Sequence, residues 1–126
     1  MEAAILQDWI TTRGTELTTS VVQSAESWAD LGACEDLVFF LDVREVTSGV
    51  QMFYETAPAK EQGAFLPMAR VAALATGVRV DRVFSTNGGV PPARYVRWRL
   101  QATSGPTWDV TFRIWIATYA WRRSVR

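Results

Sequence analysis

The sequence contains no histidine, one cysteine and one lysine. Without histidine, the chain lacks the commonest general base, the commonest metal ligand and the usual pH-sensitive side chain. Cys34 cannot form an internal disulfide, and no set of cysteines and histidines is present that could hold a metal ion. We therefore expect no catalytic site, no metal and no other cofactor, and the sequence favours binding or assembly as the function.

Long apolar runs are also missing. Residues 1–10 are acidic and lack the basic start and apolar stretch of a secretory signal peptide. No segment reaches the length of about 20 apolar residues that a membrane-spanning helix requires. We expect a protein that is made in, and first acts in, a cytoplasm and does not contact a membrane.

Hydrophobic and aromatic residues, by contrast, are plentiful. The chain has 126 residues, of which 48% are hydrophobic and 12% aromatic, including six tryptophans. This length suits one domain with one core. Six tryptophans in so small a domain suggest that some fill the core and others contact a partner.

The net charge of zero conceals an uneven distribution. Residues 1–63 hold eleven acidic and three basic residues, whereas residues 64–126 hold ten arginines and two aspartates. Two interpretations remain open. One side of the molecule is basic and another acidic, which suits contacts between like subunits, or interleaved strands mix the two halves in space.

Alternation of apolar and polar residues predicts several β-strands. In residues 37–46 it places Phe39, Leu41 and Val43 on one face, with Phe40 on the other. The segments 93–102 and 107–119 alternate in the same way, the first with Val96, Trp98 and Leu100 inward and the second with Val110, Phe112, Ile114 and Ile116 inward. Turn-forming residues at 47–49 and 104–106 predict hairpins that pair 37–46 with 50–56 and 93–102 with 107–119.

Further strands are predicted at 16–23, 65–68 and 78–85, while 69–76 is ambiguous, with a composition that suits one or two helical turns but no capping residues beside it. This pattern favours an all-β fold, an antiparallel β-sandwich with the jelly roll as one candidate form. We expect three parts: a short N-terminal arm or helix at residues 1–14, the sandwich at 15–119 and a basic C-terminal tail at 120–126.

The outward face of the predicted C-terminal hairpin is the main candidate binding site. It would bring Tyr95, Arg97 and Arg99 beside Arg113 and Trp115. Arginine stacks on aromatic rings and forms two-pronged contacts with carboxylates, so such a face suits a subunit or partner contact. The competing interpretation is a solvated sheet face with internal cation–π pairs.

Both termini supply additional candidate contacts. The tail carries Trp121, Arg122 and Arg123, and the N-terminal segment carries Trp9. A frayed end and an ordinary packed helix are the respective alternatives. Nucleic-acid binding through the arginines is disfavoured by the eleven acidic residues of the first half.

Five segments together resemble a known group of proteins, namely residues 27–31, 38–43, 54–58, 93–100 and 108–116. They resemble the small β-sandwich virion proteins that tailed bacteriophages encode beside their capsid genes. The resemblance implies a decoration or cement protein that binds the major capsid protein or other virion proteins, stabilises the head shell and is located in the virion, as a homo-oligomer. A tail or neck component is the related alternative. The Arg-Tyr-x-Arg-Trp pattern also resembles galactose-binding sandwiches, which implies a carbohydrate-binding module instead.

Overall fold

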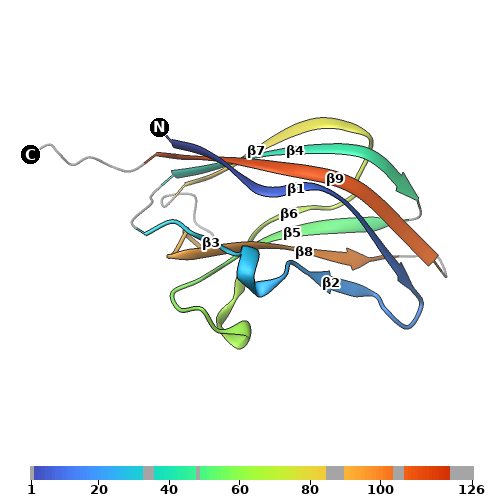
Figure 1. The fold of residues 1–126 in the computed structure, drawn as a ribbon, viewed down its shortest axis with the longest axis horizontal. Coiled ribbons are helices and arrows are strands. Elements are labelled where there is room, and N and C mark those ends of the chain that lie inside the picture. The colour runs from blue at the N-terminus through green and yellow to red at the C-terminus, as the bar shows by residue number, and fades with distance from the viewer. Residues whose placement is uncertain (1, 33–35, 48, 85–89, 104–106, 120–126) are drawn as a thin grey trace, which may run out of the picture.

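The structure is a computed structural model that describes residues 2–32, 36–47, 49–84, 90–103 and 107–119. These residues form two antiparallel sheets that pack face to face, which confirms the predicted all-β sandwich (Figure 1). The four-stranded sheet has the order β1-β9-β4-β7, formed by β1 (Glu2–Thr15), β9 (Thr107–Tyr119), β4 (Asp36–Thr47) and β7 (Gly77–Phe84).

The second sheet has the order β2-β8-β5-β6, with β3 paired to β8 as a fifth strand. Its members are β2 (Ser20–Val22), β8 (Tyr95–Ala102), β5 (Val50–Ala57), β6 (Leu66–Val71) and β3 (Ala29–Asp30). Two short 3-10 turns, η1 (Ala25–Ser27) and η2 (Gln62–Ala64), complete the regular structure. Within the described residues, no helix has the length and apolar character to cross a membrane.

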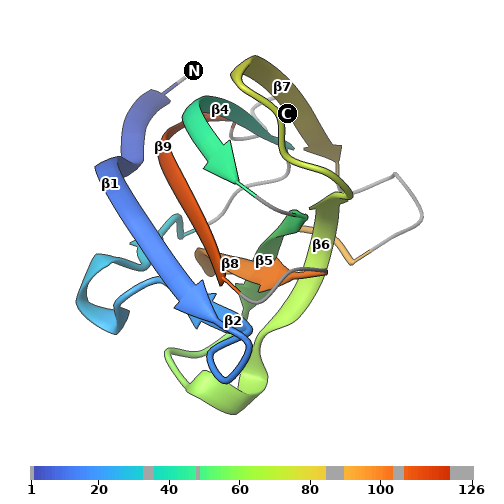
Figure 2. The ribbon, with the colours of Figure 1, turned by 90° about the vertical axis from the view of Figure 1, so that its right-hand side faces the viewer.

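The order of strand pairing makes the sandwich a jelly roll. Leaving the two-residue β3 aside, the first long strand pairs with the last, the second with the next to last, and so inward, in the pairs β1–β9, β2–β8, β4–β7 and β5–β6. Such a chain behaves like one long antiparallel ribbon wrapped around a core, which is the double Greek key of jelly rolls. Figure 2 looks along the sandwich and shows the two layers.

The inward-facing positions agree with the sequence-based alternation. Phe39, Phe112 and Leu100 are fully buried, and the remaining inward residues predicted on β4, β8 and β9 are at most 3% exposed. Burial of these large apolar side chains between the sheets supplies the main stabilising term of the fold. The core also includes Leu6 of β1, whose side chain is 4% exposed.

Both predicted hairpins are wrong, although their strands exist. β4 pairs with β7 and β9, and β5 pairs with β6 and β8, so the two strands predicted to form the first hairpin lie in opposite sheets. The same holds for β8 and β9, which belong to opposite sheets. In a jelly roll, successive long strands often change sheet, because each pairs with a strand distant in sequence.

The N-terminal segment is neither an arm nor a helix. Residues 2–15 form β1, which pairs with β9 from Glu2 opposite Thr118 to Thr15 opposite Thr107. The sandwich therefore begins at residue 2 and not at residue 15. The predicted strand at 16–23 shortens to β2, and residues 69–76 form the end of β6 and an irregular connection to β7 with no helical turn.

The topology also decides between the two interpretations of the charge distribution. Five of the six ion pairs among the described residues join an acid of residues 1–63 to an arginine of residues 64–126, namely Asp30–Arg94, Asp36–Arg82, Asp42–Arg113, Glu55–Arg97 and Glu55–Arg99. Because the first half of the chain pairs with the second half throughout, the acidic and basic halves are interleaved. The charge segregation in sequence thus matches the antiparallel ribbon and does not produce one acidic and one basic side.

Candidate assembly surface

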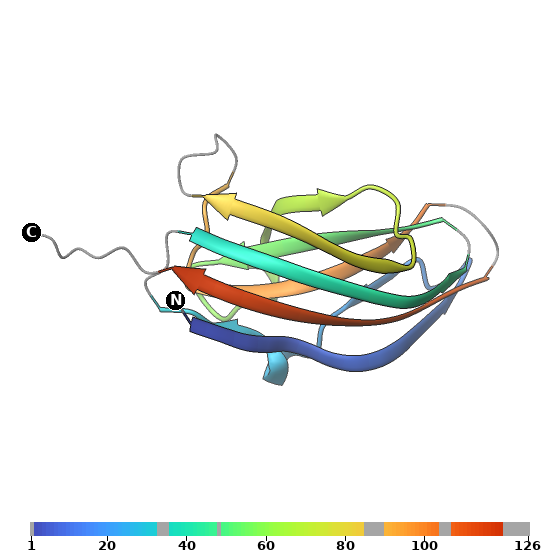
Figure 3. The ribbon, with the colours of Figure 1, turned by 90° about the horizontal axis from the view of Figure 1, so that it is seen from above.

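The outer face of the four-stranded sheet carries an apolar row that crosses all four strands. Val80 of β7 lies opposite Phe40 of β4, Phe40 lies opposite Trp115 of β9, and Trp115 lies opposite Ile5 of β1. We call these four residues the apolar row. Their side chains are 57%, 38%, 38% and 45% exposed, in that order, so each strand presents one large apolar side chain to solvent. Figure 3 shows the four strands side by side from this outer side.

The apolar row extends along the strands on both sides. Val78 of β7 is 68% exposed and lies two residues from Val80 on the same face. On the other side of the row, Val38 and Ala117 are paired in register, but they are only 7% and 4% exposed and add little to the exposed surface. A contiguous exposed apolar surface of this kind marks an interaction site more often than a bare sheet face.

β7 presents Val78 and Val80 outward because two of its three charged residues, Arg79 and Asp81, lie on the inward face. Asp81 lies opposite the buried Phe39, and Arg79 lies opposite the buried Leu41. Arg79 and Asp81 form an ion pair of 2.8 Å at the margin of the sandwich, and the hydrogen bond to Asp81 raises the pKa of Arg79. Val78 and Val80 consequently point to solvent, where alternation alone would have assigned them to the core.

A cluster of tryptophan and arginine borders the apolar row. The Arg113 guanidinium carbon lies 4.7 Å from the ring centre of Trp9 and 5.6 Å from that of Trp115. Arg44 approaches the Trp9 ring to 4.2 Å. Each contact is a cation–π interaction, which holds the flat rings and guanidinium groups against the sheet. Arg113 also forms an ion pair of 3.4 Å with Asp42.

Three of the predicted site residues therefore come together here. Trp9, Arg113 and Trp115 were each expected to contact a partner, and the structure places them in this one cluster. Sequence reasoning missed the exposed neighbours Val78 and Val80. The signal that could have found them was the Arg79–Asp81 spacing in β7, since two charged residues at alternate positions leave the intervening valines on the opposite face.

The other three described site residues lie on the five-stranded sheet, on the opposite side of the sandwich. The predicted face that joined them to Arg113 and Trp115 does not exist, because β8 and β9 are not paired. Tyr95 lies at the start of β8 beside an exposed ion pair of Arg94 with Asp30, and the hydrogen bond from Arg94 lowers the pKa of Asp30. Trp121, Arg122 and Arg123 lie outside the described residues.

Arg97 is a buried structural residue. Its side chain is 5% exposed, and its Nε donates to Glu55 Oε1 at 2.9 Å while its Nη1 donates to Gln62 at 3.0 Å. Phe65 covers the guanidinium at 3.9 Å, and Trp28 lies 5.1 Å from it. A partner has little access to this group, so the expected contact role does not fit its position.

Arg99 shares the same carboxylate and is 22% exposed. Its Nε donates to Glu55 Oε2 at 2.8 Å, and its guanidinium stacks on Phe53 at 4.2 Å. Glu55 is thus held between two arginines, with its side chain only 6% exposed. This arrangement accounts for both arginines by internal contacts, in contrast to the outer face of the four-stranded sheet.

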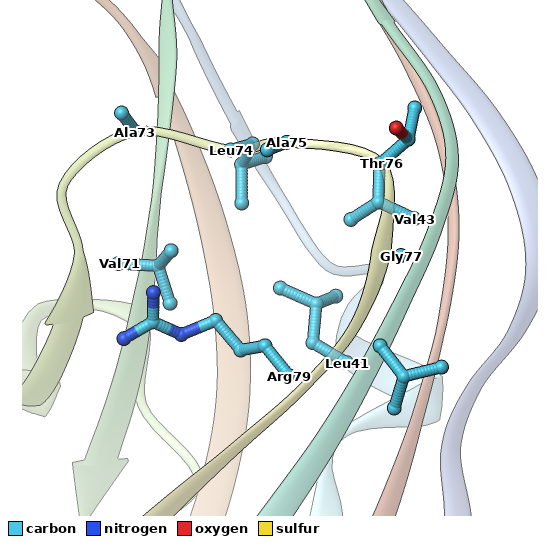
Figure 4. A pocket seen from close by; sticks show the side chains of 10 residues that line it. Leu41, Val43, Val71, Ala73, Leu74, Ala75, Thr76, Gly77 and Arg79 are labelled. Carbon is cyan, nitrogen blue, oxygen red and sulfur yellow. The ribbon is translucent and has the colours of Figure 1, made fainter.

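A small cavity lies at the side of the sandwich where β6 and β7 face each other across the two sheets. Figure 4 shows its mostly apolar lining, which includes Leu41, Val71, Leu74 and Arg79. Its volume of about 140 Å³ is well below that of pockets that hold small-molecule ligands. In the part of the chain that the structure describes, no group of acidic, cysteine or histidine side chains is placed to hold a metal ion.

Neither a protein-family model nor a curated protein sequence matches the chain. Among solved structures, the chain is similar to the K2 cleaved adhesin domain of Lys-gingipain, with 11% identity, a TM-score of 0.50 and coverage of 92% of this chain and 88% of that one. This likeness concerns the fold alone. A protein of the disulfide-linked pili of Bacillus endospore appendages aligns over 95% of this chain and 93% of its own, with 12% identity and a TM-score of 0.43, too low to support an argument.

Proposed function

We propose that the chain is a non-enzymatic structural protein that works by assembly, and specifically a decoration or cement protein of a tailed-phage head. The observation that carries the proposal is the apolar row, which leaves Trp115 and Phe40 each 38% exposed in the middle of a sheet face. Large apolar side chains in register across a whole sheet are costly to leave in water. They are stabilised when another protein surface covers them.

The composition of the surface supports protein contact. Tryptophan and arginine are the residues that most often dominate the binding energy of interfaces, and Trp9, Arg113 and Trp115 are adjacent here. The cation–π contacts hold these side chains in place before binding, which reduces the entropy lost on association. On a shell of many identical subunits, modest affinity per contact is amplified by the number of copies.

Co-sedimentation with phage heads that lack the chain tests the proposal. We expect saturable binding at a fixed ratio to the major capsid protein, and binding to isolated tails would instead indicate a tail or neck component. Trp115→Ala should weaken binding about 30-fold, as for a central interface residue, with little change in melting temperature. Leu66→Ala is the matched control, because Leu66 is 56% exposed on the opposite sheet.

Two results would contradict the proposal. Absence of saturable binding to heads or tails would remove the virion role. A large fall in melting temperature for Trp115→Ala with unchanged binding would show that Trp115 serves the stability of the fold.

A carbohydrate-binding module is the second candidate, and one observation favours it. Phe40 and Trp115 are paired across adjacent strands and present aromatic surface on a flat sheet, where a sugar ring can stack. The neighbouring positions weaken this candidate, because Val78, Val80 and Ile5 provide no hydrogen bonds for sugar hydroxyl groups. Binding to bacterial polysaccharides on a glycan array, lost in Trp115→Ala, would favour this function over assembly.

A further inference from the structure

We propose that a second copy of this chain covers the apolar row, so that two sandwiches pack face to face through their four-stranded sheets about a two-fold axis. The inference rests on the assembly role proposed above and deepens it by naming the partner of this surface. It follows from the size of the face, its charges and the construction of the sheet edges.

The face has the size that a stable dimer needs. β4 has 12 residues, so the sheet is about 40 Å long, and four strands make it about 19 Å wide. The resulting area of about 760 Å² is close to the roughly 800 Å² that each partner contributes to a standard interface. The apolar row and Val78 lie across its middle, with polar residues toward the ends of the strands.

The charges of the face are compatible with an identical partner. Asp42 pairs with Arg113 on one side of the apolar row, and Asp36 pairs with Arg82 on the other. Because each acid already has an arginine beside it, two copies can approach without net repulsion. A two-fold contact places the same patch on both subunits, and a row of large apolar side chains without strong net charge meets that requirement.

The sheet edges disfavour the alternative of joining two copies strand to strand. Exposed edges invite such pairing unless bulges, proline, short strands or inward-facing charges oppose it. Each edge of this sandwich has one of these features. β1 contains two register shifts, β6 contains Pro67, β2 has only three residues, and β7 faces Arg79 and Asp81 inward. The apolar face remains as the surface through which two copies can associate.

A dimer of this form suits attachment to a shell. Such a dimer buries the apolar rows between its two copies. The rest of the surface of each copy stays exposed, so the dimer offers two identical surfaces to the shell. Two linked binding sites on a shell of repeated subunits gain affinity from their connection. The particle contact then lies outside the apolar row. The weaker particle binding expected for Trp115→Ala therefore arises through loss of the dimer, which removes this second attachment.

Sedimentation equilibrium of the purified chain tests the dimer, with Val80→Arg as the disrupting variant. A two-fold interface contains each substitution twice, so we expect the dimer dissociation constant to rise about a hundredfold or more. Leu66→Arg is the matched control, since Leu66 is 56% exposed on edge strand β6 of the opposite sheet and Val80 is 57% exposed on edge strand β7. Val78→Arg provides a second disrupting variant if Val80→Arg does not fold.

The expected result is a dimer for the wild type and Leu66→Arg, and a folded monomer for Val80→Arg or Val78→Arg. A wild-type chain that stays monomeric up to high concentration overturns the inference, and so does a dimer that survives both valine substitutions or is lost in Leu66→Arg. Particle binding is scored separately. A monomer that binds heads at a fixed ratio overturns only the dimer, whereas a dimer that ignores heads and tails overturns only the virion role.

Discussion

Glu55 is the residue on which the outer side of the five-stranded sheet most depends. Its two carboxylate oxygens accept hydrogen bonds from Arg97 at 2.9 Å and Arg99 at 2.8 Å, and its side chain is 6% exposed. Removing one charge from a buried ionic group leaves the remaining charges buried without a partner. The resulting loss in free energy of unfolding is larger than the net contribution of the intact group.

Glu55→Gln should therefore lower the free energy of unfolding by about 3 kcal/mol or more, because two buried or half-buried guanidinium groups would lose their shared carboxylate. Urea unfolding followed by tryptophan fluorescence measures the change. Asp30→Asn is the control, since Asp30 and Arg94 form an exposed pair and the substitution should leave stability nearly unchanged. Equal effects of the two substitutions would contradict the structural role assigned to Glu55.

Tyr54 provides a pH-dependent prediction. Its ring is fully buried and stacks on Phe39 at 3.8 Å, and its hydroxyl has no hydrogen-bond partner within the described residues. Burial raises the pKa of Tyr54 well above its ordinary value of 10.0, and the negative charge of Asp81 adds to the rise. Since the folded pKa is higher than the unfolded one, the resulting stability is present below pH 10 and is lost as the pH rises further.

Tyr54→Phe should consequently flatten the alkaline limb of the stability profile, where this one group contributes a slope of about 1.4 kcal/mol per pH unit. At pH 7 the variant should be as stable as the wild type or more stable by about 1 kcal/mol, because it removes a buried hydroxyl that lacks a partner. Unfolding curves between pH 7 and 11 measure both effects. Parallel loss of stability in the two proteins above pH 10 would contradict the account.

At the scale of elements, β1 shows how the two ends of the chain are joined. Gly14 lies opposite Trp108 of β9, whose buried indole donates a hydrogen bond to the Thr18 carbonyl at 3.0 Å. A Cβ at position 14 would clash with both the Trp108 indole and the Thr18 carbonyl. Glycine in a strand often marks such a close approach.

Gly14→Ala should lower the free energy of unfolding by about 2 kcal/mol, as expected for overpacking beside a buried side chain. Gly63→Ala is the matched control, because an added Cβ there meets no atom within 4 Å. Thermal unfolding of the two variants measures the difference. An equally small effect at both positions would mean that the Trp108 indole does not lie against β1 as described.

Apart from β1, which was expected to be an arm or helix, the long strands and their buried faces could be predicted from the sequence, but their partners could not. Alternation reports which face of a strand a residue such as Phe39 or Phe112 occupies, and both are inward. It contains no information on which strand lies alongside. The turn-forming residue types at 47–49 and 104–106 suggested pairing between strands adjacent in sequence, whereas the jelly roll pairs strands that are far apart, such as β1 with β9.

The same limit explains the outcome for the candidate site. Trp9, Arg113 and Trp115 could be selected from the sequence because tryptophan and arginine are typical of interfaces. Their separation from Arg97 and Arg99 depends on β8 and β9 lying in different sheets. Burial of Arg97 beneath Phe65 and beside Trp28 likewise depends on contacts between segments distant in sequence.

At the scale of the whole molecule, each half of the sequence supplies one member of most ion pairs among the described residues. Acids of the first half meet arginines of the second half across the paired strands, as in Asp36–Arg82 and Asp42–Arg113. Such opposite charges favour the native pairing over pairing within one half. The two sides of the sandwich differ in a further respect, since large apolar residues in register cross the four-stranded sheet and an internally satisfied ionic group occupies the other sheet.

Burial of Trp115 and Phe40 in the assembled protein is the central claim, and hydroxyl-radical footprinting with mass spectrometry tests it most directly. Side-chain oxidation is compared for the chain as a dilute monomer, at dimer-forming concentration and bound to phage heads. We predict a several-fold drop in oxidation of Trp115 and Phe40 on assembly, with Leu66 on the opposite sheet unchanged in the dimer. Oxidation of Trp115 and Phe40 that stays at the monomer level in every assembled state would contradict the account.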